Sequence, residues 1–157
     1  MRVVVCGVAG AGKTVVGRRL AEKLGCPFLD ADDFHSAANK AKMASRTPLS
    51  DDDRWPWLDA LNQALRERPD VVLACSALKQ VYRDRLQTGI DELRWIALVG
   101  SRKVLQSRID ARVDHFMPPD MLESQLATWE PMVEGASIDV SAALDDVVGQ
   151  ALDALTS

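Results

Sequence analysis

The sequence predicts an α/β protein, a three-layer sandwich built around a five-stranded parallel sheet. Apolar runs alternate with amphipathic segments along the 157 residues, which is typical of strands joined by right-handed crossover helices. Two runs, Val71–Cys75 and Trp95–Val99, are continuously apolar, as expected for central strands covered by helices on both faces. The first apolar run leads into a glycine-rich loop and a helical repeat, the strand–loop–helix order that a phosphate-binding loop needs.

Each strand is predicted from a short run of strand-forming residues between turn signals. The five expected strands are Arg2–Cys6, Pro27–Asp30, Val71–Cys75, Trp95–Val99 and Ser137–Val140. Helices are predicted where apolar residues recur every three or four positions. In chain order, the apolar helix faces are Val16-Leu20-Leu24, then Trp57-Leu58-Leu61-Leu65 in a segment starting near Asp53, and last Leu144, Val147, Val148, Ala151, Leu152 and Leu155.

We expect one domain over residues 1–157, because the chain shows no repeat, low-complexity tract or linker. Two stretches break the strand–helix alternation, a polar one at about 33–54 and a charged one at about 107–119. Since α/β proteins place ligand loops at the carboxyl ends of their strands, the first is predicted to be a substrate flap and the second a lid. Ordinary surface excursions are the alternative for both stretches.

Composition argues against several classes of protein. The net charge of −4 disfavours nucleic acid as a partner, since nucleic-acid-binding domains usually carry a basic face. No apolar stretch approaches the roughly 20 residues that cross a bilayer, and no signal peptide is evident, so no membrane partner is expected. Cys6, Cys26 and Cys75 lack metal-ligand spacing, and two of them end apolar runs. Buried reduced thiols, and therefore a cytoplasmic location, are expected.

Residues 7–14 carry the strongest signal in the chain. They read Gly7-Val8-Ala9-Gly10-Ala11-Gly12-Lys13-Thr14 and match the phosphate-loop pattern G-x-x-x-x-G-K-[ST] in full. Lys13 is predicted to reach the β- and γ-phosphates of a nucleotide, and the Thr14 hydroxyl to hold Mg²⁺. The predicted ligands of the nucleotide are Gly7, Ala9, Gly10, Ala11, Gly12, Lys13, Thr14 and Val15. The alternative, a turn that merely joins a strand to a helix, does not need the Lys-Thr pair.

A second candidate site follows the second expected strand, which ends in Asp30-Ala31-Asp32-Asp33. In an extended chain Asp30 and Asp32 point to the same side. One carboxylate is suited to orient Mg²⁺ or its water, and the other to accept a hydroxyl proton from a phosphoryl acceptor. The alternative is that these acids cap the next helix, which suits Asp33 best.

Further motifs then identify a resemblance. The chain resembles the small, single-domain gluconokinases, and the motifs that carry this are Asp30–His35, Asn39, Lys42-Met43-Ala44, Pro48-Leu49, Asp51–Leu58, Cys75–Lys79, Tyr82–Asp84, His115-Phe116, Leu122 and Ser124-Gln125. The Asp-Asp-Asp-Arg and Cys-Ser-Ala-Leu-Lys runs are specific to that family, whereas many families share the phosphate loop. The resemblance implies a fold similar to shikimate kinase and nucleoside monophosphate kinases. It also implies ATP and Mg²⁺ as cofactors, and transfer of the ATP γ-phosphate to the 6-hydroxyl of D-gluconate.

The resemblance also implies roles for single residues. Asp32 looks like the residue that receives the hydroxyl proton, and Asp30 like the carboxylate on the Mg²⁺ side. Arg54 sits where related kinases hold the substrate carboxylate, a contact that suits a planar guanidinium. Ser76 and Lys79 follow the third strand and suit the carboxylate or hydroxyls of the sugar acid. The weaker flap candidates are His35, which suits a helix start equally well, and Lys42.

Plain structural alternatives accompany the basic candidates. Arg54 also fits a surface position in the first turn of a helix, paired with Asp51 or Asp52. Lys79 and Arg83 are four residues apart and also fit a solvated helix face.

The lid stretch holds Arg108 and Arg112, which are four residues apart on one helical face. The resemblance places Arg108 against the adenine and Arg112 over the phosphates, where a cation stabilises the charge that develops during transfer. The alternative is a basic surface helix. Relatives often carry a proline after the fifth strand that packs on adenine, and Ala143 stands near that place here, so weaker adenine packing is expected.

Other functions stay open at this level. One is a kinase of a different hydroxy acid such as shikimate, although Ser76-Ala77-Leu78 is not the glycine triplet usual in shikimate kinases. Another is a nucleotide-binding module without catalysis, against which the presence of both Lys13 and Asp32 argues. The oligomeric state also stays open between a homodimer and a monomer, since Trp55, Trp57 or Trp129 suits either a dimer contact or buried packing.

Overall fold

The computed structural model describes residues 1–111 and 119–157 and confirms the predicted α/β class. Within these residues five parallel strands form one sheet in the order β2-β3-β1-β4-β5. The strands are β1 (Arg2–Cys6), β2 (Phe28–Asp30), β3 (Val71–Ala74), β4 (Arg94–Val99) and β5 (Ala136–Asp139). All five predicted strands are therefore present, with ends that differ by at most one residue from those expected.

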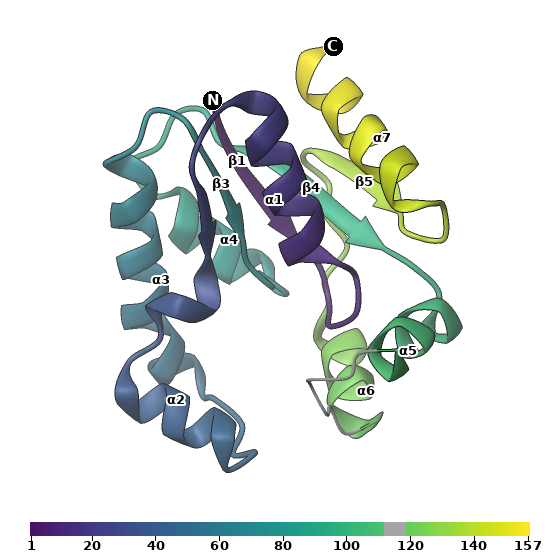
Figure 1. The fold of residues 1–157 in the computed structure, drawn as a ribbon. Coiled ribbons are helices and arrows are strands. Elements are labelled where there is room, and N and C mark those ends of the chain that lie inside the picture. Colours follow the sequence, from purple (N-terminus) through teal and green to yellow (C-terminus); the bar gives the residue numbers. More distant parts are fainter. Residues whose placement is uncertain (112–118) are drawn as a thin grey trace.

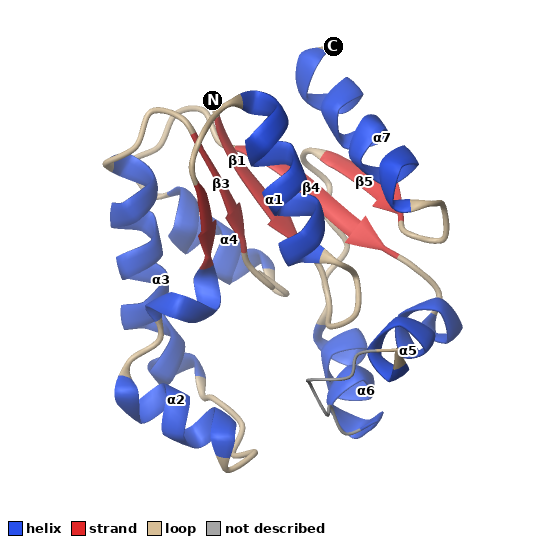
Figure 2. Ribbon diagram, viewed as in Figure 1, coloured by secondary structure: helices blue, strands red, loops and turns tan. Residues whose placement is uncertain are grey.

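Helices cover both faces of the sheet (Figures 1 and 2). The helices are α1 (Lys13–Leu24), η1 (a 3₁₀ helix, Ala31–Phe34), α2 (Ala37–Ala44), α3 (Asp51–Arg66), α4 (Gln80–Gln87), α5 (Arg102–Asp110), α6 (Pro119–Thr128) and α7 (Leu144–Thr156). Helices α1 and α7 cover one face, and α3 and α4 cover the other. The arrangement is the three-layer sandwich that the sequence predicts. No helix in the described part of the chain is long and apolar enough to span a membrane.

The alternation along β1 shows how the two cores form. Val3 and Val5 belong to the core under α1 and α7, whereas Val4 and Cys6 belong to the core under α3 and α4. All four side chains are fully buried, because β1 lies between β3 and β4 and is covered on both faces. The parallel strands bring all their carboxyl ends to one edge of the sheet, and the loops at that edge hold the predicted site.

The buried cysteines agree with the expected reduced thiols. Cys6 and Cys75 are buried and Cys26 is half-buried, and all three are free. Burial raises the pKa of both Cys6 and Cys75 to about 12, so these two thiols stay protonated at neutral pH. Of the three tryptophans considered for a dimer contact, Trp57 is buried in the core, while Trp55 and Trp129 are half-buried.

The flap stretch forms local structure of its own. It comprises the end of η1, helix α2 and the first turn of α3. A capping box starts α3: the Asp53 N–H donates to Ser50 Oγ at 3.1 Å, and the Ser50 N–H donates to Asp53 Oδ2 at 2.9 Å. In the lid stretch, residues 107–111 end α5 and its C-cap, and 112–118 lie outside the described residues.

Candidate active site

The phosphate loop joins β1 to α1, as the motif predicts. Gly10 has a φ of 82°, and a Cβ atom there would lie 2.7 Å from the Leu105 carbonyl oxygen and 2.9 Å from Ile109 Cγ1. Both the backbone angle and the lack of space therefore require glycine. Gly12 has a φ of 90° in the left-handed region and is the N-cap of α1. The free N–H groups of the first turn of α1 therefore point towards the space that the loop encloses.

Three predicted phosphate and metal ligands lie beside this loop. The Lys13 ammonium group folds back over the loop and donates to the Val8 carbonyl oxygen at 3.1 Å. The Thr14 hydroxyl donates to Asp30 Oδ2 at 3.3 Å, which joins the start of α1 to the end of β2. A hydroxyl and a carboxylate are hard oxygen donors that fit Mg²⁺. Within residues 1–111 and 119–157 no group of three or more His, Cys, Asp or Glu side chains gathers as a metal site.

The geometry of Asp30 and Asp32 differs from the extended chain that the sequence suggested. The chain turns into η1 directly after Asp30, and Asp30 Oδ1 accepts from the Asp32 N–H at 3.0 Å. Asp30 is therefore the helix cap, a role that the sequence suggested for Asp33. The competing hydrogen bond from a carboxylate to the next backbone turn overrides the extended conformation.

The Asp32 carboxyl group interacts electrostatically with Asp30, Asp33 and Lys13. Desolvation and the negative charge of Asp30 raise the pKa of Asp32 above its ordinary value, and Asp33 adds to this, while Lys13 opposes it. The pKa shift places Lys13, Asp30 and Asp32 in one electrostatic group. A carboxyl group with a raised pKa is a better proton acceptor near neutral pH.

Two basic side chains, Arg54 and Lys79, lie close to the ring of Tyr82. We call Asp51, Arg54, Lys79 and Tyr82 the Tyr82 cluster. The Arg54 guanidinium lies 5.3 Å and the Lys79 ammonium 5.7 Å from the centre of the Tyr82 ring. Arg54 donates to the Leu49 carbonyl oxygen at 2.9 Å and to the Tyr82 hydroxyl at 3.3 Å. It also lies 3.6 Å from Asp51, so the predicted alternative of an ion pair in the first helical turn is present as well.

Tyr82 holds this cluster together. Its hydroxyl donates to Asp51 Oδ1 at 2.5 Å, and this bond lowers the pKa of Asp51. Burial, followed by the bond to Asp51, raises the pKa of Tyr82 to about 12, so the phenol stays neutral. Two cations thus flank one neutral ring, which favours an anionic ligand.

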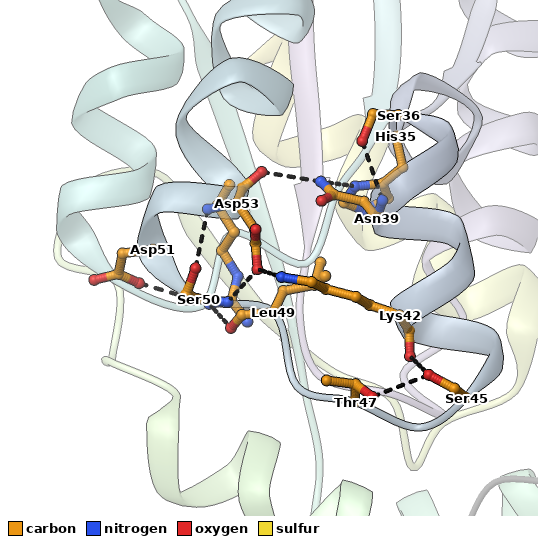
Figure 3. A network of polar contacts seen from close by, with 11 residues as sticks. His35, Ser36, Asn39, Lys42, Ser45, Thr47, Leu49, Ser50, Asp51 and Asp53 are labelled. Carbon is orange, nitrogen blue, oxygen red and sulfur yellow. Dashed lines mark hydrogen bonds and ion pairs between the residues drawn. The ribbon is translucent and has the colours of Figure 1, made fainter.

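The flap candidates His35 and Lys42 belong to a polar network that braces the flap (Figure 3). Lys42 Nζ lies 2.8 Å from Asp53 Oδ2, and this bond is the main reason why the pKa of Asp53 is lowered to about 2. Asn39 Nδ2 donates to the Asp53 carbonyl oxygen at 2.9 Å and lies 3.3 Å from His35 Nδ1. His35 is buried and stacks on Trp57, with ring centres 4.2 Å apart. Burial and the charge of Arg54 lower the pKa of His35. These contacts support a packing role for His35.

The buried side chain of Arg83 shapes the loop after β3, residues 76–79. Arg83 is 1% exposed, so the solvated-face alternative is wrong for this position. Its Nε donates to the Ala77 carbonyl oxygen at 2.8 Å, and its guanidinium lies 4.7 Å from the centre of the Trp129 ring. Ala77 has a φ of 40°, an unfavourable angle for a residue with a Cβ atom, which the Arg83 bond helps to maintain. The Tyr82-Arg83-Asp84 motif was the only signal for this role.

The residue predicted to contact adenine, Arg108, lies next to the chain that follows β5. Arg108 donates to the carbonyl oxygens of Val140 and Ala142, the latter at 3.5 Å. Its guanidinium therefore lies against the segment that contains Ala143, which is exposed. The other predicted lid cation, Arg112, lies outside the described residues.

A phosphate loop, a carboxylate beside it and a cationic cluster, all at the carboxyl edge of a parallel sheet, define a P-loop kinase. Residues 3–133 match a family model described as an AAA domain. A probable gluconokinase of Dictyostelium discoideum is 42% identical over 163 residues, which cover 93% of this chain and 82% of the relative. A crystal structure of a gluconokinase from Sinorhizobium meliloti 1021 has a TM-score of 0.92 and 43% identity, and covers 98% of this chain and 90% of that chain. The chain belongs to the gluconokinase family.

A more distant likeness confirms the expected fold. The shikimate kinase from Bacteroides thetaiotaomicron has a TM-score of 0.74 at 16% identity, covering 100% of this chain and 99% of that chain. At this identity the likeness concerns the fold alone. The predicted relation to shikimate kinases is therefore a relation of architecture.

Proposed function

We propose that the protein phosphorylates D-gluconate on its 6-hydroxyl with ATP and Mg²⁺, giving 6-phospho-D-gluconate and ADP. The observation that carries the proposal is the placement of Asp32. It lies on η1, which follows β2 next to Thr14 and contacts α3, the helix that carries Arg54. The short helix that carries Asp32 therefore lies between the end of β2, which bonds to Thr14, and the helix that carries Arg54.

The residues divide the chemistry as follows. The other loop amides and Lys13 hold the triphosphate and balance the charge that spreads over the γ-phosphoryl oxygens, whereas the Ala9 amide, a predicted ligand, donates to Gln125 instead. Thr14 and Asp30 would hold the Mg²⁺ ion, which supplies further charge neutralisation when bound. Asp32 accepts the proton of the 6-hydroxyl while the hydroxyl oxygen bonds to the γ-phosphorus. The bond from phosphorus to the β–γ bridging oxygen breaks, and ADP leaves with that electron pair.

The Tyr82 cluster is proposed to bind the carboxylate end of the acceptor. Arg54 supplies a planar guanidinium and Lys79 a point charge, and Ser76 adds a hydroxyl from the same loop as Lys79. We also propose that Arg108 and Arg112 serve the nucleotide, Arg108 at the adenine. The buried, protonated thiols of Cys6 and Cys75 support a reducing compartment, the cytoplasm.

A panel of acceptors tests the proposed function. Purified protein with Mg-ATP is given gluconate, shikimate and other sugar acids, and ADP release is followed. We expect turnover with gluconate well above that with every other acid. Turnover on another acid without turnover on gluconate would refute the substrate assignment.

Replacing Arg54 with alanine is expected to raise the KM for gluconate by about 10–100-fold, as for loss of a charged hydrogen bond. Some loss of kcat is expected as well, because the guanidinium also orients the acceptor. The KM for ATP should stay within about twofold, since Arg54 belongs to the acceptor side. Steady-state kinetics with each substrate varied in turn measures this.

Arg19→Ala is the matched control for this prediction. Arg19 pairs with Asp145 on the surface at 2.7 Å and belongs to α1, away from the Tyr82 cluster. We expect both KM values to be unchanged in this variant. An Arg54→Ala enzyme with an unchanged KM for gluconate would remove Arg54 from the acceptor site.

A further inference from the structure

One side chain from α6 reaches the phosphate loop. The Ala9 N–H donates to Gln125 Oε1 at 2.7 Å, a contact between residues 116 apart in the chain. Ala9 is 7% exposed, and a buried backbone N–H needs a partner. Gln125 is half-buried on α6 and supplies it. The Ser124-Gln125 motif marked this position in the sequence, without a role.

The chain just after α6 is fixed to the loop at residues 76–79. The Glu130 N–H donates to the Leu78 carbonyl oxygen at 2.8 Å, and the Glu130 carbonyl oxygen accepts from Arg83 at 2.6 Å. The Glu130 carboxylate accepts from the Gln80 N–H at 3.0 Å. Gln125 stands about one helical turn before this anchor, and its carbonyl oxygen accepts from the Trp129 N–H at 2.9 Å. Residues 125–130 therefore contact the phosphate loop at one end and, at the other, residues 76–79, which we call the acceptor-side loop.

Arg83 shows how firmly the anchor is built. It is fully buried, yet it donates to backbone carbonyl oxygens, and its Nη1 has no hydrogen-bond partner among the described residues. A buried guanidinium without a carboxylate partner is costly. The cost is offset by its bonds to Ala77, Leu78 and Glu130, which tie the loop and the end of α6 into one unit.

We propose that Gln125 is a positioning residue for phosphoryl transfer: its side-chain carbonyl holds the Ala9 amide, and so fixes the spacing between the phosphate loop and the acceptor-side loop. The proposal rests on the proposed function for its kinetic consequence. In-line transfer needs reacting atoms about 3–3.5 Å apart, and a misplacement of about 1 Å costs on the order of 10²-fold in rate. A loop that contains Gly10 and Gly12 is pliant, and a fixed partner for Ala9 limits its movement.

Gln125→Met tests the hydrogen bond at nearly constant length, because methionine offers Ala9 no comparable acceptor. We expect kcat to fall about tenfold while the KM for gluconate stays within about twofold. Gln125→Glu keeps an acceptor for the Ala9 N–H, so kcat should stay nearer to that of the wild type. A kcat of Gln125→Met within about twofold of the wild type would overturn the proposal.

A second test uses charge to probe where Gln125 lies, and it needs no sugar acid in the assay. Binding of a non-hydrolysable ATP analogue with Mg²⁺ is compared in Gln125→Glu and Ser124→Glu, which carry the same added charge one position apart on α6. Ser124 is exposed, so its variant should bind like the wild type. Gln125→Glu should bind about five- to tenfold more weakly, because a carboxylate at the loop repels the triphosphate.

The two readouts separate this inference from the proposed function. If the wild type fails to phosphorylate gluconate, the substrate assignment falls, and the binding comparison still judges Gln125. Equal affinities in Gln125→Glu and Ser124→Glu would overturn the placement of Gln125 at the phosphates. If Gln125→Met does not fold, as a thermal melt shows, the binding comparison decides alone.

Discussion

Replacing Asp32 with asparagine is expected to lower kcat by about 10²–10⁴, the usual cost of removing a general base. Asparagine has nearly the shape of aspartate but cannot take the hydroxyl proton. ATP affinity should change far less, because Asp32 is proposed to act on the acceptor oxygen and not on the phosphates. Steady-state turnover gives kcat, and titration with a non-hydrolysable ATP analogue gives the affinity.

The same substitution should make the folded protein more stable at neutral pH. In the fold the pKa of Asp32 lies above its ordinary value of 3.8, so the ionised carboxylate is less favourable there than in the unfolded chain. This cost is fully present above the folded pKa and disappears below 3.8. Because asparagine carries no charge, Asp32→Asn removes the cost, and Tm should rise at pH 7. A rise in Tm together with a loss of kcat is the result expected if Asp32 serves the reaction at a cost to the stability of the fold.

Asp33→Asn is the matched control for the kcat measurement. Asp33 is the next residue in η1, is also exposed, and loses the same charge on substitution. We expect its kcat to stay within about threefold of the wild type. Equal turnover in the wild type and Asp32→Asn would contradict the proposed base, and would favour the reading of the chain as a nucleotide-binding module.

The phosphate loop and the five strands were predictable because their signals are local. Gly10 must be glycine for reasons of backbone angle and space, and the continuously apolar run of β4 must be covered on both faces. The Asp30 and Asp32 geometry was not predictable from alternation. A carboxylate that follows a strand can bond to the backbone two residues on, and this closes a turn that a residue pattern does not show.

The Asp51-Asp52-Asp53-Arg54 run shows how similar residues take different roles. Asp51 accepts from Tyr82, whereas Asp53 completes the capping box with Ser50 at the start of α3 and pairs with Lys42. The resemblance marked the run as specific, and the structure supplies a physical reason for two of its acids. Long-range partners such as Tyr82 could not be deduced from sequence spacing alone, because 31 residues separate it from Asp51.

Arg83 and Gln125 were missed for the same reason. Each acts through backbone groups that are remote in sequence, at Glu130 for Arg83 and at Ala9 for Gln125. A charged residue four positions from Lys79 suits a solvated helix face, and burial became evident only from the packing of Trp129 over the guanidinium. The motifs flagged both positions, but a motif without geometry gives no role.

Replacing Lys13 with methionine is expected to lower kcat by about 10²–10³, comparable to removing one preorganised donor from a developing charge. The ammonium now bonds to the Val8 carbonyl oxygen within the loop, so the side chain is already folded over the place where the phosphates bind. Methionine keeps the length and the apolar stem but carries no charge. ATP binding should weaken as well, because the same cation is proposed to contact the β- and γ-phosphates in the ground state.

Lys23→Met tests whether the lost charge alone has this effect. Lys23 lies in the last turn of the same helix, is exposed, and changes the net charge equally. Its kcat should stay within about twofold of the wild type. Lys13→Arg separates charge from shape: a guanidinium restores the charge but is broader than an ammonium at a loop built for a compact group, so only partial recovery is expected. Full activity in Lys13→Met would mean that the loop binds phosphate without taking part in its transfer.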